Sequence, residues 1–307
     1  KNPNTLLVDA GDTLHGTTFS NISEGKSMME LMNAIGFTVS IPGNHDFNYG
    51  FDKLLELSKS AKFNYLCANV INKSDKSLAF TPNVIEEVDG VKIGFFGLAT
   101  PETRYKSSPK NTATVEFADY IETAKKQVYD LKKQGATVII AVTHLGVDMS
   151  SQERSDILAQ QVKGIDLIID GHSHTMLEKG KKVGNTTIAQ TGEYLKNIGK
   201  VDLTIKDGKV EKIEASLVKY EQAKSIKPNE KIVELIKKAE ENNKPILEKK
   251  IGTSKTELVG VRERVRVGET NLGDLVTDAM KASVSSDVAI TNGGGIRASI
   301  SKGDIKM

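Results

Sequence analysis

Four short apolar segments of this 307-residue chain each run directly into a turn that carries residue types able to bind metal ions. Helical patterns separate these segments, over residues 26–34, 51–60, 116–133 and 152–162. Strands that alternate with helices predict an α/β domain, in which the carboxyl ends of the strands share one edge of the sheet. The four turns are therefore expected to converge. The segments and their turns are 6–8 with Gly11-Asp12, 37–41 with Gly43-Asn44-His45-Asp46, 138–142 with Thr143-His144, and 165–169 with Gly171-His172-Ser173-His174.

Two hairpins make the predicted architecture mixed rather than purely parallel. Asp89-Gly90 separates residues 83–88 from 91–98, and Asp207-Gly208 separates residues 200–206 from 209–218. Asp-Gly between two alternating apolar segments is a strong hairpin signal. We therefore expect antiparallel pairs beside the parallel strands.

The chain is expected to contain two domains joined by a helix. Residues 251–267 look extended, residues 272–282 helical, and residues 288–291 like a strand. We predict a first domain over residues 1–228, a polar connecting helix over 229–249, and the N-terminal part of a second domain over 250–307. The abrupt entry from Lys1 into an apolar segment suggests a piece of a longer protein.

Composition excludes several classes of protein. The net charge of +2 is too small to argue for a nucleic-acid polymer or a membrane surface as the partner. No apolar run of about 18 residues or more occurs, so no transmembrane segment is expected. The single cysteine, Cys67, rules out an internal disulfide framework and is expected to be a buried apolar residue. The sequence does not indicate an oligomeric state.

The residue types at the four turns fit one chemistry. The chain has five histidines, and four of them lie at or directly after these strand ends. One such histidine would more often be structural, but four junctions of this kind are hard to explain by structure alone. Imidazole suits zinc, manganese and similar ions, and a carboxylate can bridge two of them. Two metals about 3.5–4 Å apart can activate water and hold both oxygens of a phosphoryl transfer.

These motifs resemble those of the calcineurin-like metallophosphoesterases, in the usual order. More narrowly, residues 7–13, 93–102 and 292–297 are similar to the secreted 5′-nucleotidase family, which includes 2′,3′-cyclic-nucleotide phosphodiesterases and UDP-sugar hydrolases. The resemblance implies a four-layer α/β/β/α sandwich followed by the incomplete start of a 5′-nucleotidase-type substrate-binding domain. It also implies two divalent metal ions, such as zinc or manganese, in the intact protein.

The resemblance assigns the metal ligands residue by residue. Asp12 would bridge the two metals, and Asn44, His144 and His172 would complete one site. His174 would bind the other metal. The family begins with an Asp-x-His motif on a strand before Leu6, which this chain lacks. One site is therefore expected to be complete in this chain, and the chain itself could be inactive.

The resemblance also assigns catalytic roles to His45 and Asn48. His45 would donate a proton or stabilise the phosphoryl oxygens, with support of the loop as the alternative. 5′-Nucleotidases usually place Asp three residues after this histidine, whereas this chain has Asn48. An amide orients an imidazole but cannot stabilise imidazolium as a carboxylate does. This difference tilts the expected substrate towards the broader or cyclic-nucleotide branch.

Three residues of the second domain are expected to bind the substrate. The resemblance places Asn292 and Arg297 against the nucleotide, in a turn whose three glycines let a ligand approach the backbone. Arg266 is a further candidate, because guanidinium groups suit phosphate. For Arg262 and Arg264 an edge strand with outward-pointing charges is an equal alternative.

Other polar residues near the motifs are expected to play supporting parts. His15 has no ligand role in the family and is expected at the surface or behind the ligands. Asp9 and Asp170 precede the motif residues and are expected to hold ligands or turns.

The expected function is metal-dependent hydrolysis of nucleotide phosphate esters, as a 5′-nucleotidase or a 2′,3′-cyclic-nucleotide 2′-phosphodiesterase/3′-nucleotidase. The alternatives are a UDP-sugar hydrolase and a catalytically silent surface module that keeps the fold. A dinucleotide-binding enzyme ranks far below, since no G-x-G-x-x-G follows the first apolar segment. The family resemblance implies an extracellular, cell-wall-associated or periplasmic location.

Overall fold

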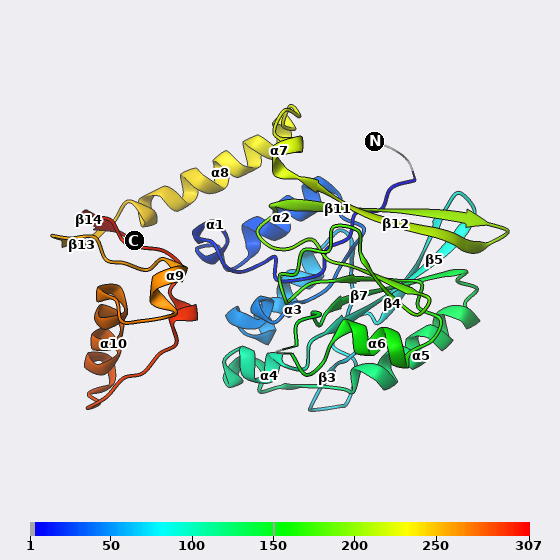
Figure 1. The fold of residues 1–307 in the computed structure, drawn as a ribbon, viewed down its shortest axis with the longest axis horizontal. Coiled ribbons are helices and arrows are strands. Elements are labelled where there is room, and N and C mark those ends of the chain that lie inside the picture. Colours follow the sequence, from blue (N-terminus) through cyan, green and yellow to red (C-terminus); the bar gives the residue numbers. More distant parts are fainter. Residues whose placement is uncertain (1–3, 150) are drawn as a thin grey trace. The chain divides into compact units, whose positions relative to one another are not determined.

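The computed structural model describes residues 4–149 and 151–307, in which strands and helices alternate as expected (Figure 1). The chain divides into two compact units, one extending to Lys237 and the other running from Lys238 to Met307. The division falls within helix α8, Glu230–Leu247, which lies within the range of the expected connector, residues 229–249.

The helices vary from single turns to five turns. The α-helices are α1 (Thr18–Asn21), α2 (Lys26–Ile35), α3 (Phe51–Ser60), α4 (Thr103–Lys106), α5 (Tyr120–Lys133), α6 (Ser155–Gln161), α7 (Tyr220–Ala223), α8, α9 (Arg262–Val265) and α10 (Asn271–Val284). Short 3₁₀ helices are η1 (His45–Tyr49), η2 (Pro109–Thr112) and η3 (Gly293–Gly295). The strands are β1 (Val39–Ser40), β2 (Asn64–Tyr65), β3 (Val70–Asn72), β4 (Asn83–Val88), β5 (Val91–Ala99), β6 (Val115–Phe117), β7 (Val138–His144), β8 (Leu167–Asp170), β9 (Lys181–Val183), β10 (Thr186–Ala189), β11 (Asn197–Lys206), β12 (Lys209–Lys219), β13 (Lys250–Ser254) and β14 (Gly303–Lys306).

A six-stranded sheet in the order β4-β5-β7-β8-β10-β9 organises the first unit. The four inner strands are parallel, and the two edge strands run antiparallel to their neighbours. β7 is buried along its whole length, as a strand covered on both faces must be. The expected mixture of parallel and antiparallel pairs is confirmed.

The two faces of this sheet pack against different layers. Ile139 and Ala141 of β7 contribute to a core that includes residues of α5 and α6. The alternate residues Ile140 and Val142 belong to a second core, which contains side chains of β1 and of the long β11–β12 hairpin (Figure 1). Successive side chains of a strand point to opposite faces, so one strand serves both cores.

A third core completes the layers. Side chains of α2 and α3, including Met29 and Leu54, pack with Tyr65 and Cys67 from the segment that follows α3. Cys67 is buried as predicted, and burial raises the pKa of its thiol to about 11. Helices thus flank two β layers, and the expected α/β/β/α sandwich is confirmed.

Both predicted hairpins form. β4 pairs with β5 and β11 with β12, each antiparallel around its Asp-Gly turn. Asp89 and Asp207 have φ of 50°, and Gly90 and Gly208 have φ of 75° and 70°. Positive φ at both central positions is the turn geometry that matches the twist of two paired strands.

Three boundaries in the first unit differ from the expectation. The helix expected over residues 116–133 begins at Tyr120, because the side chain of Asp119 caps it and residues 115–117 pair with β3 instead. The helix expected over 152–162 is limited to residues 155–161. Residues 6–8 form a single bridge, from Val8 to Val39, rather than a regular strand.

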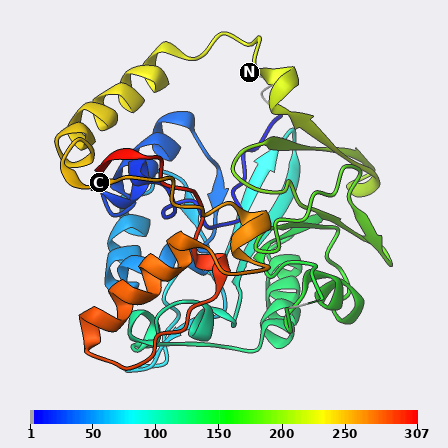
Figure 2. The same cartoon turned by 60° about the vertical axis from the view of Figure 1, so that its left-hand side comes forward.

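The second unit corrects two further expectations. Residues 251–267 are not extended throughout, since β13 ends at Ser254 and residues 262–265 form α9. The edge strand considered for Arg262 and Arg264 is therefore wrong. The strand expected over residues 288–291 is absent, and Val288 and Ile290 are 69% and 86% exposed. An apolar run becomes a strand only where a neighbour pairs with its backbone. Within the described residues β13 pairs with β14 instead, and α10 of this unit is the longer orange helix in Figure 2.

Gly97, in the middle of β5, should tolerate no side chain. A Cβ there would overlap the carbonyl oxygen of Leu66 and lie 2.8 Å from Ile41 Cγ2. We expect Gly97→Ala to lower the free energy of unfolding by about 1–3 kcal/mol, because both neighbours lie in packed structure. Urea unfolding measures the change. Gly252→Ala is the control, since a Cβ at Gly252 meets nothing within 4 Å. Equal stability of both variants would contradict the packing described here.

Candidate metal centre

The carboxyl ends of β5, β7 and β8 lie side by side. Ala99 of β5 pairs with His144 of β7, and Thr143 pairs with Asp170 of β8. The segments that follow these strands therefore leave the sheet at the same edge. His172 and Glu102 are carried on two of them, and His144 is the last residue of β7.

Two further loops meet this edge through a close backbone contact. A Cβ at Gly43 would lie 2.5 Å from the amide nitrogen of Asp12 and would overlap its carboxylate. A Cβ at Gly11 would lie 2.5 Å from the amide nitrogen of Gly43. Glycine at both positions is what allows the Asp12 loop and the Asn44 loop to lie against each other.

Asp46 joins these two loops. Its buried carboxylate accepts hydrogen bonds from the backbone amides of Asp12 (2.8 Å), Leu14 (2.8 Å) and Gly43 (2.7 Å). The backbone amide of His45 in turn donates to Asp12 Oδ1 at 2.7 Å. Burial and the nearby Asp12 charge raise the pKa of Asp46 to about 7, although the three amides favour its ionised form.

Asp12, His144 and His172 form a group in which one potential ligand atom of each lies within 4.8 Å of the others. His144 Nε2 lies 3.0 Å from Asp12 Oδ2, while its Nδ1 lies 2.6 Å from the carbonyl oxygen of Ala10. A carbonyl accepts, so Nδ1 carries a proton and Nε2 faces the carboxylate. The structure thus brings together three of the predicted metal ligands.

The electrostatics of Asp12 and His144 are those of a buried ion pair. Burial alone would disfavour both charges, but the imidazole of His144 outweighs it and lowers the pKa of Asp12. Burial also opposes the charged form of His144. The charge of Asp12 and the Ala10 carbonyl favour that form more strongly, so the pKa of His144 rises to about 9. A divalent cation would replace the proton on His144 Nε2 as the partner of this carboxylate.

Asn44 supplies an independent reason to place a cation here. Asn44 is 2% exposed, and its Oδ1 has no hydrogen-bond partner in the part of the chain that the structure describes. A buried carbonyl oxygen without a partner is costly unless something binds it. One amide oxygen, two imidazoles and a carboxylate are a donor set that suits zinc or manganese. The residues therefore fit the expected metal.

Two residues that the sequence patterns did not reveal, Glu102 and Lys106, hold His172. Glu102 is 1% exposed, and its Oε2 lies 3.2 Å from His172 Nε2 and 2.7 Å from Lys106 Nζ. Burial opposes its charge, but Lys106, the Gln152 amide and His172 outweigh burial and lower the pKa of Glu102 to about 2. Burial, His144 and Lys106 lower the pKa of His172 to about 4, so its imidazole is neutral and able to bind metal. Glu102 lies three residues after the last residue of β5, so the strand-end rule that identified His144 could have found it.

His174 lies outside the three-residue group. Its side chain is 46% exposed, and its Nδ1 contacts Oε2 of Glu193 at 2.8 Å. Glu193 was also missed, because it follows β10 in a segment with no motif. The role of His174 at a second metal stays a prediction.

His45 and Asn48 lie together, with His15 beside them. Asn48 Nδ2 lies 3.1 Å from His45 Nδ1 and 3.3 Å from His15 Nδ1. The two imidazole rings stack, with centroids 5.9 Å apart and an angle of 11° between their planes. Asn48 thus contacts the histidine to which sequence reasoning assigned it.

Asp9 and Asp170 hold the loops on which the ligands lie. Asp9 accepts from the hydroxyls of Thr13 and Ser40, and Asp170 accepts from the hydroxyl of Thr143 and the amides of Leu145 and Gly146. Burial raises the pKa of both carboxyls. Their contacts are those of supports for the turns.

In the second unit, Asn292 and Arg266 lie around the glycine-rich turn η3. A Cβ at Gly294 would be 2.9 Å from Asn292 Oδ1 and 3.6 Å from the Arg266 guanidinium. Arg266, Asn292 and Arg297 are all exposed. The structure therefore places two of the three predicted substrate residues side by side within this unit.

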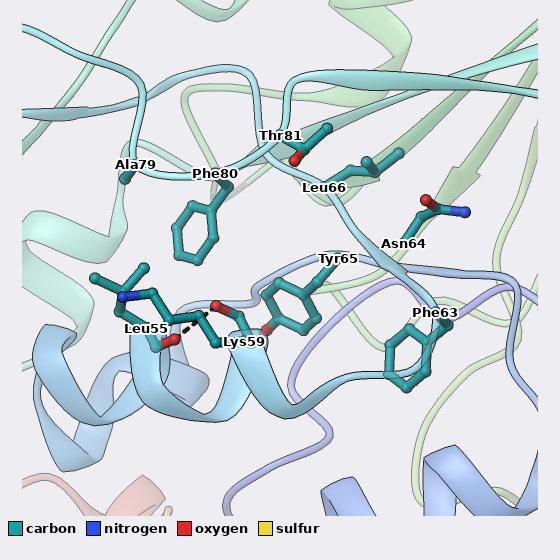
Figure 3. Close-up of a pocket in the computed structure, with 10 residues that line it drawn as sticks. Leu55, Lys59, Phe63, Asn64, Tyr65, Leu66, Ala79, Phe80 and Thr81 are labelled. Carbon is teal, nitrogen blue, oxygen red and sulfur yellow. Dashed lines mark hydrogen bonds between the residues drawn. The ribbon is translucent and has the colours of Figure 1, made fainter.

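The first unit also contains a cavity of about 310 Å³ (Figure 3). It is bounded by Leu55 and Lys59 of α3 and by the rings of Phe63, Tyr65 and Phe80. None of the predicted site residues lines it. The cavity is therefore distinct from the group of candidate metal ligands at the strand ends.

Comparison with known families matches both parts of the chain. Residues 1–176 match the calcineurin-like phosphoesterase model, and residues 250–307 match the 5′-nucleotidase C-terminal domain. The chain is 32% identical, over 98% of its length, to the trifunctional nucleotide phosphoesterase protein YfkN of Bacillus subtilis, of which it covers 23%. It is 28% identical, again over 98% of its length, to the 5′-nucleotidase of Vibrio cholerae, of which it covers 62%.

A solved structure agrees with the fold. The 5′-nucleotidase precursor of Thermus thermophilus superimposes with a TM-score of 0.80 and 29% identity, covering the whole of this chain and 63% of that one. The present chain therefore spans less than two thirds of each of these relatives.

Removing the carboxylate that holds His172 should weaken metal binding. We expect Glu102→Gln to lower the affinity for Mn²⁺ or Zn²⁺ by about 10- to 100-fold, because the amide no longer fixes the imidazole as strongly. Calorimetric titration measures the affinity, and circular dichroism checks the fold. Glu86→Gln is a matched control, since Glu86 also accepts from a side chain, Asn64 Nδ2 at 2.8 Å, but in β4. An unchanged affinity in Glu102→Gln would show that Glu102 does not act on His172.

Metal binding should release a proton near neutral pH. Below its raised pKa of about 9, His144 is protonated, and a metal ion requires its neutral form. We expect about one proton to be released per metal ion at pH 7, and the apparent affinity to rise about tenfold per pH unit towards pH 9. Calorimetry in buffers of different ionisation enthalpy counts the proton. A binding enthalpy that is independent of the buffer would contradict the assignment.

Proposed function

We propose that this chain, which belongs to the calcineurin-like phosphoesterase family and continues into a 5′-nucleotidase C-terminal segment, hydrolyses phosphate ester bonds of nucleotides. The observation that carries the proposal is the convergence of Asp12, His144 and His172. The adjoining Asn44 loop lies against the Asp12 loop, and Asn44 Oδ1 is buried without a hydrogen-bond partner among the described residues. YfkN is named a trifunctional nucleotide phosphoesterase and the Vibrio protein a 5′-nucleotidase, and both are similar to almost the whole of this chain.

Several residues of this chain would have distinct roles in the proposed hydrolysis. Asp12, Asn44, His144 and His172 would hold a divalent cation, with Asp12 also facing a second one. Such ions, when bound, supply a nucleophilic water and offset charge on the phosphoryl oxygens. Glu102 fixes His172, and the Ala10 carbonyl fixes His144, so the ligands are preorganised. His45 is linked to Asp12 through its backbone amide, which places its side chain next to the metal ligands.

The contact between Asn48 and His45 favours a particular substrate branch. An amide hydrogen bond holds the imidazole in place without stabilising its positive charge. The 5′-nucleotidase pattern usually has Asp at this position, and Asn48 departs from it. We therefore propose cyclic-nucleotide or broad nucleotide specificity, with hydrolysis of UDP-sugars as the alternative.

In the second unit, Asn292, Arg266 and Arg297 are proposed to bind the nucleotide. The side-chain oxygen Oδ1 of Asn292 and the guanidinium of Arg266 lie at the same glycine turn. Carbonyl oxygens accept from base or ribose groups, and guanidinium groups bind phosphate. Glycine at position 294 leaves the space between them open to a ligand.

Assays on three substrates test the proposed function. We would measure hydrolysis of AMP, 2′,3′-cyclic AMP and UDP-glucose with added Mn²⁺ and with a chelator, using Asp12→Asn as the inactive control. Metal-dependent turnover of 2′,3′-cyclic AMP above AMP supports the cyclic branch. Turnover of UDP-glucose alone supports the sugar hydrolase. Nucleotide binding without any turnover would support the silent surface module and sink the enzymatic proposal.

His45 is expected to act in turnover and not in metal binding. We expect His45→Ala to lower kcat by about 100-fold or more while the metal content stays unchanged, because a general acid or stabilising group contributes at least that much. Elemental analysis and calorimetry measure the metal content. Loss of metal in His45→Ala would make His45 a ligand.

We also expect the site at Asp12, Asn44, His144 and His172 to bind a metal ion more tightly than any second site.

The proposed location of the protein is extracellular, cell-wall-associated or periplasmic. No helix in residues 4–149 and 151–307 is long and apolar enough to cross a membrane.

A further inference from the structure

The amide of Asn48 is shared between two imidazoles, only one of which the proposed function uses. Its nitrogen faces Nδ1 of both His45 and His15, and an amide nitrogen has two hydrogens to donate. Its oxygen accepts from the hydroxyl of Ser107 at 3.1 Å. Ser107 Oγ in turn accepts from Asn111 Nδ2 at 3.3 Å, so its own hydrogen is available for Asn48. This chain of donors fixes the direction of the amide.

The same hydrogen bonds fix the form of both rings. A neutral imidazole that accepts at Nδ1 carries its hydrogen on Nε2. His15 and His45 are therefore both held with an N–H group at Nε2. Neither Nε2 has a hydrogen-bond partner among the residues that the structure describes. The stacked rings of His15 and His45 therefore offer two Nε2–H donors that have no acceptor among the described residues.

The position of this pair indicates what the acceptor is. His45 is exposed and His15 is half-buried, so an anion can reach them. The backbone of His45 is bonded to Asp12, the proposed bridging ligand, so the pair adjoins the metal centre. Burial lowers the pKa of His15, which favours its neutral form. A phosphate ester at the metals offers oxygens that accept such hydrogen bonds.

We propose that His15 is a second substrate-contacting residue, which donates a hydrogen bond from Nε2 to a phosphoryl oxygen beside the one from His45. The proton remains on His15 throughout, and Asn48 positions both rings. This inference rests on the proposed phosphoesterase site but assigns a role to a residue that the family roles leave out. It predicts that the contact binds a phosphate group in general, whatever nucleotide carries it.

Kinetics on generic esters test the contact. We expect His15→Ala to lower kcat/KM by about tenfold or more for both p-nitrophenyl phosphate and bis(p-nitrophenyl) phosphate, with unchanged metal content. His15→Gln should recover part of the loss, since its amide also offers an N–H donor. Tyr49→Phe is the control, because it keeps the ring against His15 and removes only the hydroxyl that donates to Asn21. An unchanged kcat/KM in a folded His15→Ala protein would overturn the proposal.

A measurement without turnover separates this inference from the proposed function. Nitrogen-15 NMR of the Zn²⁺-loaded chain should show both His15 and His45 protonated at Nε2, and both resonances should move on titration with inorganic phosphate. Asn48→Asp should transfer the hydrogen to Nδ1, because a carboxylate only accepts. If wild type responds to phosphate at both rings but hydrolyses nothing, the proposed hydrolysis fails and the His15 contact stands. If phosphate moves His45 and leaves His15 unchanged, the contact is wrong even in an active enzyme.

Discussion

The carboxylate of Asp46 is the constraint on which the rest of the candidate centre depends. It binds backbone amides from the Asp12 loop and from the Asn44 loop at once. Neither loop belongs to the large sheet, so neither would be positioned by strand pairing alone. Glycine at positions 11 and 43 removes the side chains that would keep the loops apart. Asp12 and Asn44, the proposed bridging and amide ligands, therefore lie on loops whose backbones Asp46 holds together.

The sheet fixes the other half of the centre. His144 ends a strand that is buried along its whole length, and His172 follows the next strand. Nδ1 of His144 donates to the carbonyl oxygen of Ala10, and Nε2 of His172 contacts the carboxylate of Glu102. Buried charges such as Asp12 and Glu102 are tolerated because each has an opposite charge in contact. A cation at Asp12 would also remove the negative charge that raises the pKa of Asp46.

Next to the charged candidate ligands lies a second group of side chains, which are joined by hydrogen bonds between uncharged groups. Asn48, Ser107 and Asn111 form a chain without formal charge that ends on two imidazoles. An acidic residue in place of Asn48 would draw a proton onto the rings, whereas the amide holds both in the donor form. The site therefore combines a strongly charged half that suits metals with an uncharged half that suits a phosphoryl group. On the proposed function, one edge of the sheet would provide both the metal ligands and the contacts to the phosphoryl group.

Much of this was predictable from the sequence. The alternation of apolar segments and helical patterns predicted an α/β domain, and each Asp-Gly pair predicted its hairpin, because these signals depend only on neighbouring residues. The four-layer sandwich was implied by the family resemblance. The strand-end rule brought Asp12, His144 and His172 together correctly. Signals that depend on a distant partner failed. Residues 288–291 have the composition of a strand but no neighbour pairs with them among the described residues, and Arg262 lies in a helical turn.

The sequence by itself determined which residue types stand at the ends of the strands, and so the chemistry available there. Only the tertiary structure decided which partners those residues have. The contacts of Glu102 with His172, of Glu193 with His174 and of Asn48 with His15 span 70, 19 and 33 residues. No local pattern encodes such pairs, because they depend on how separate strands and loops are placed by the packing of the cores between them. The ligands could be recognised from the chain, but the groups that orient them could be seen only in the fold.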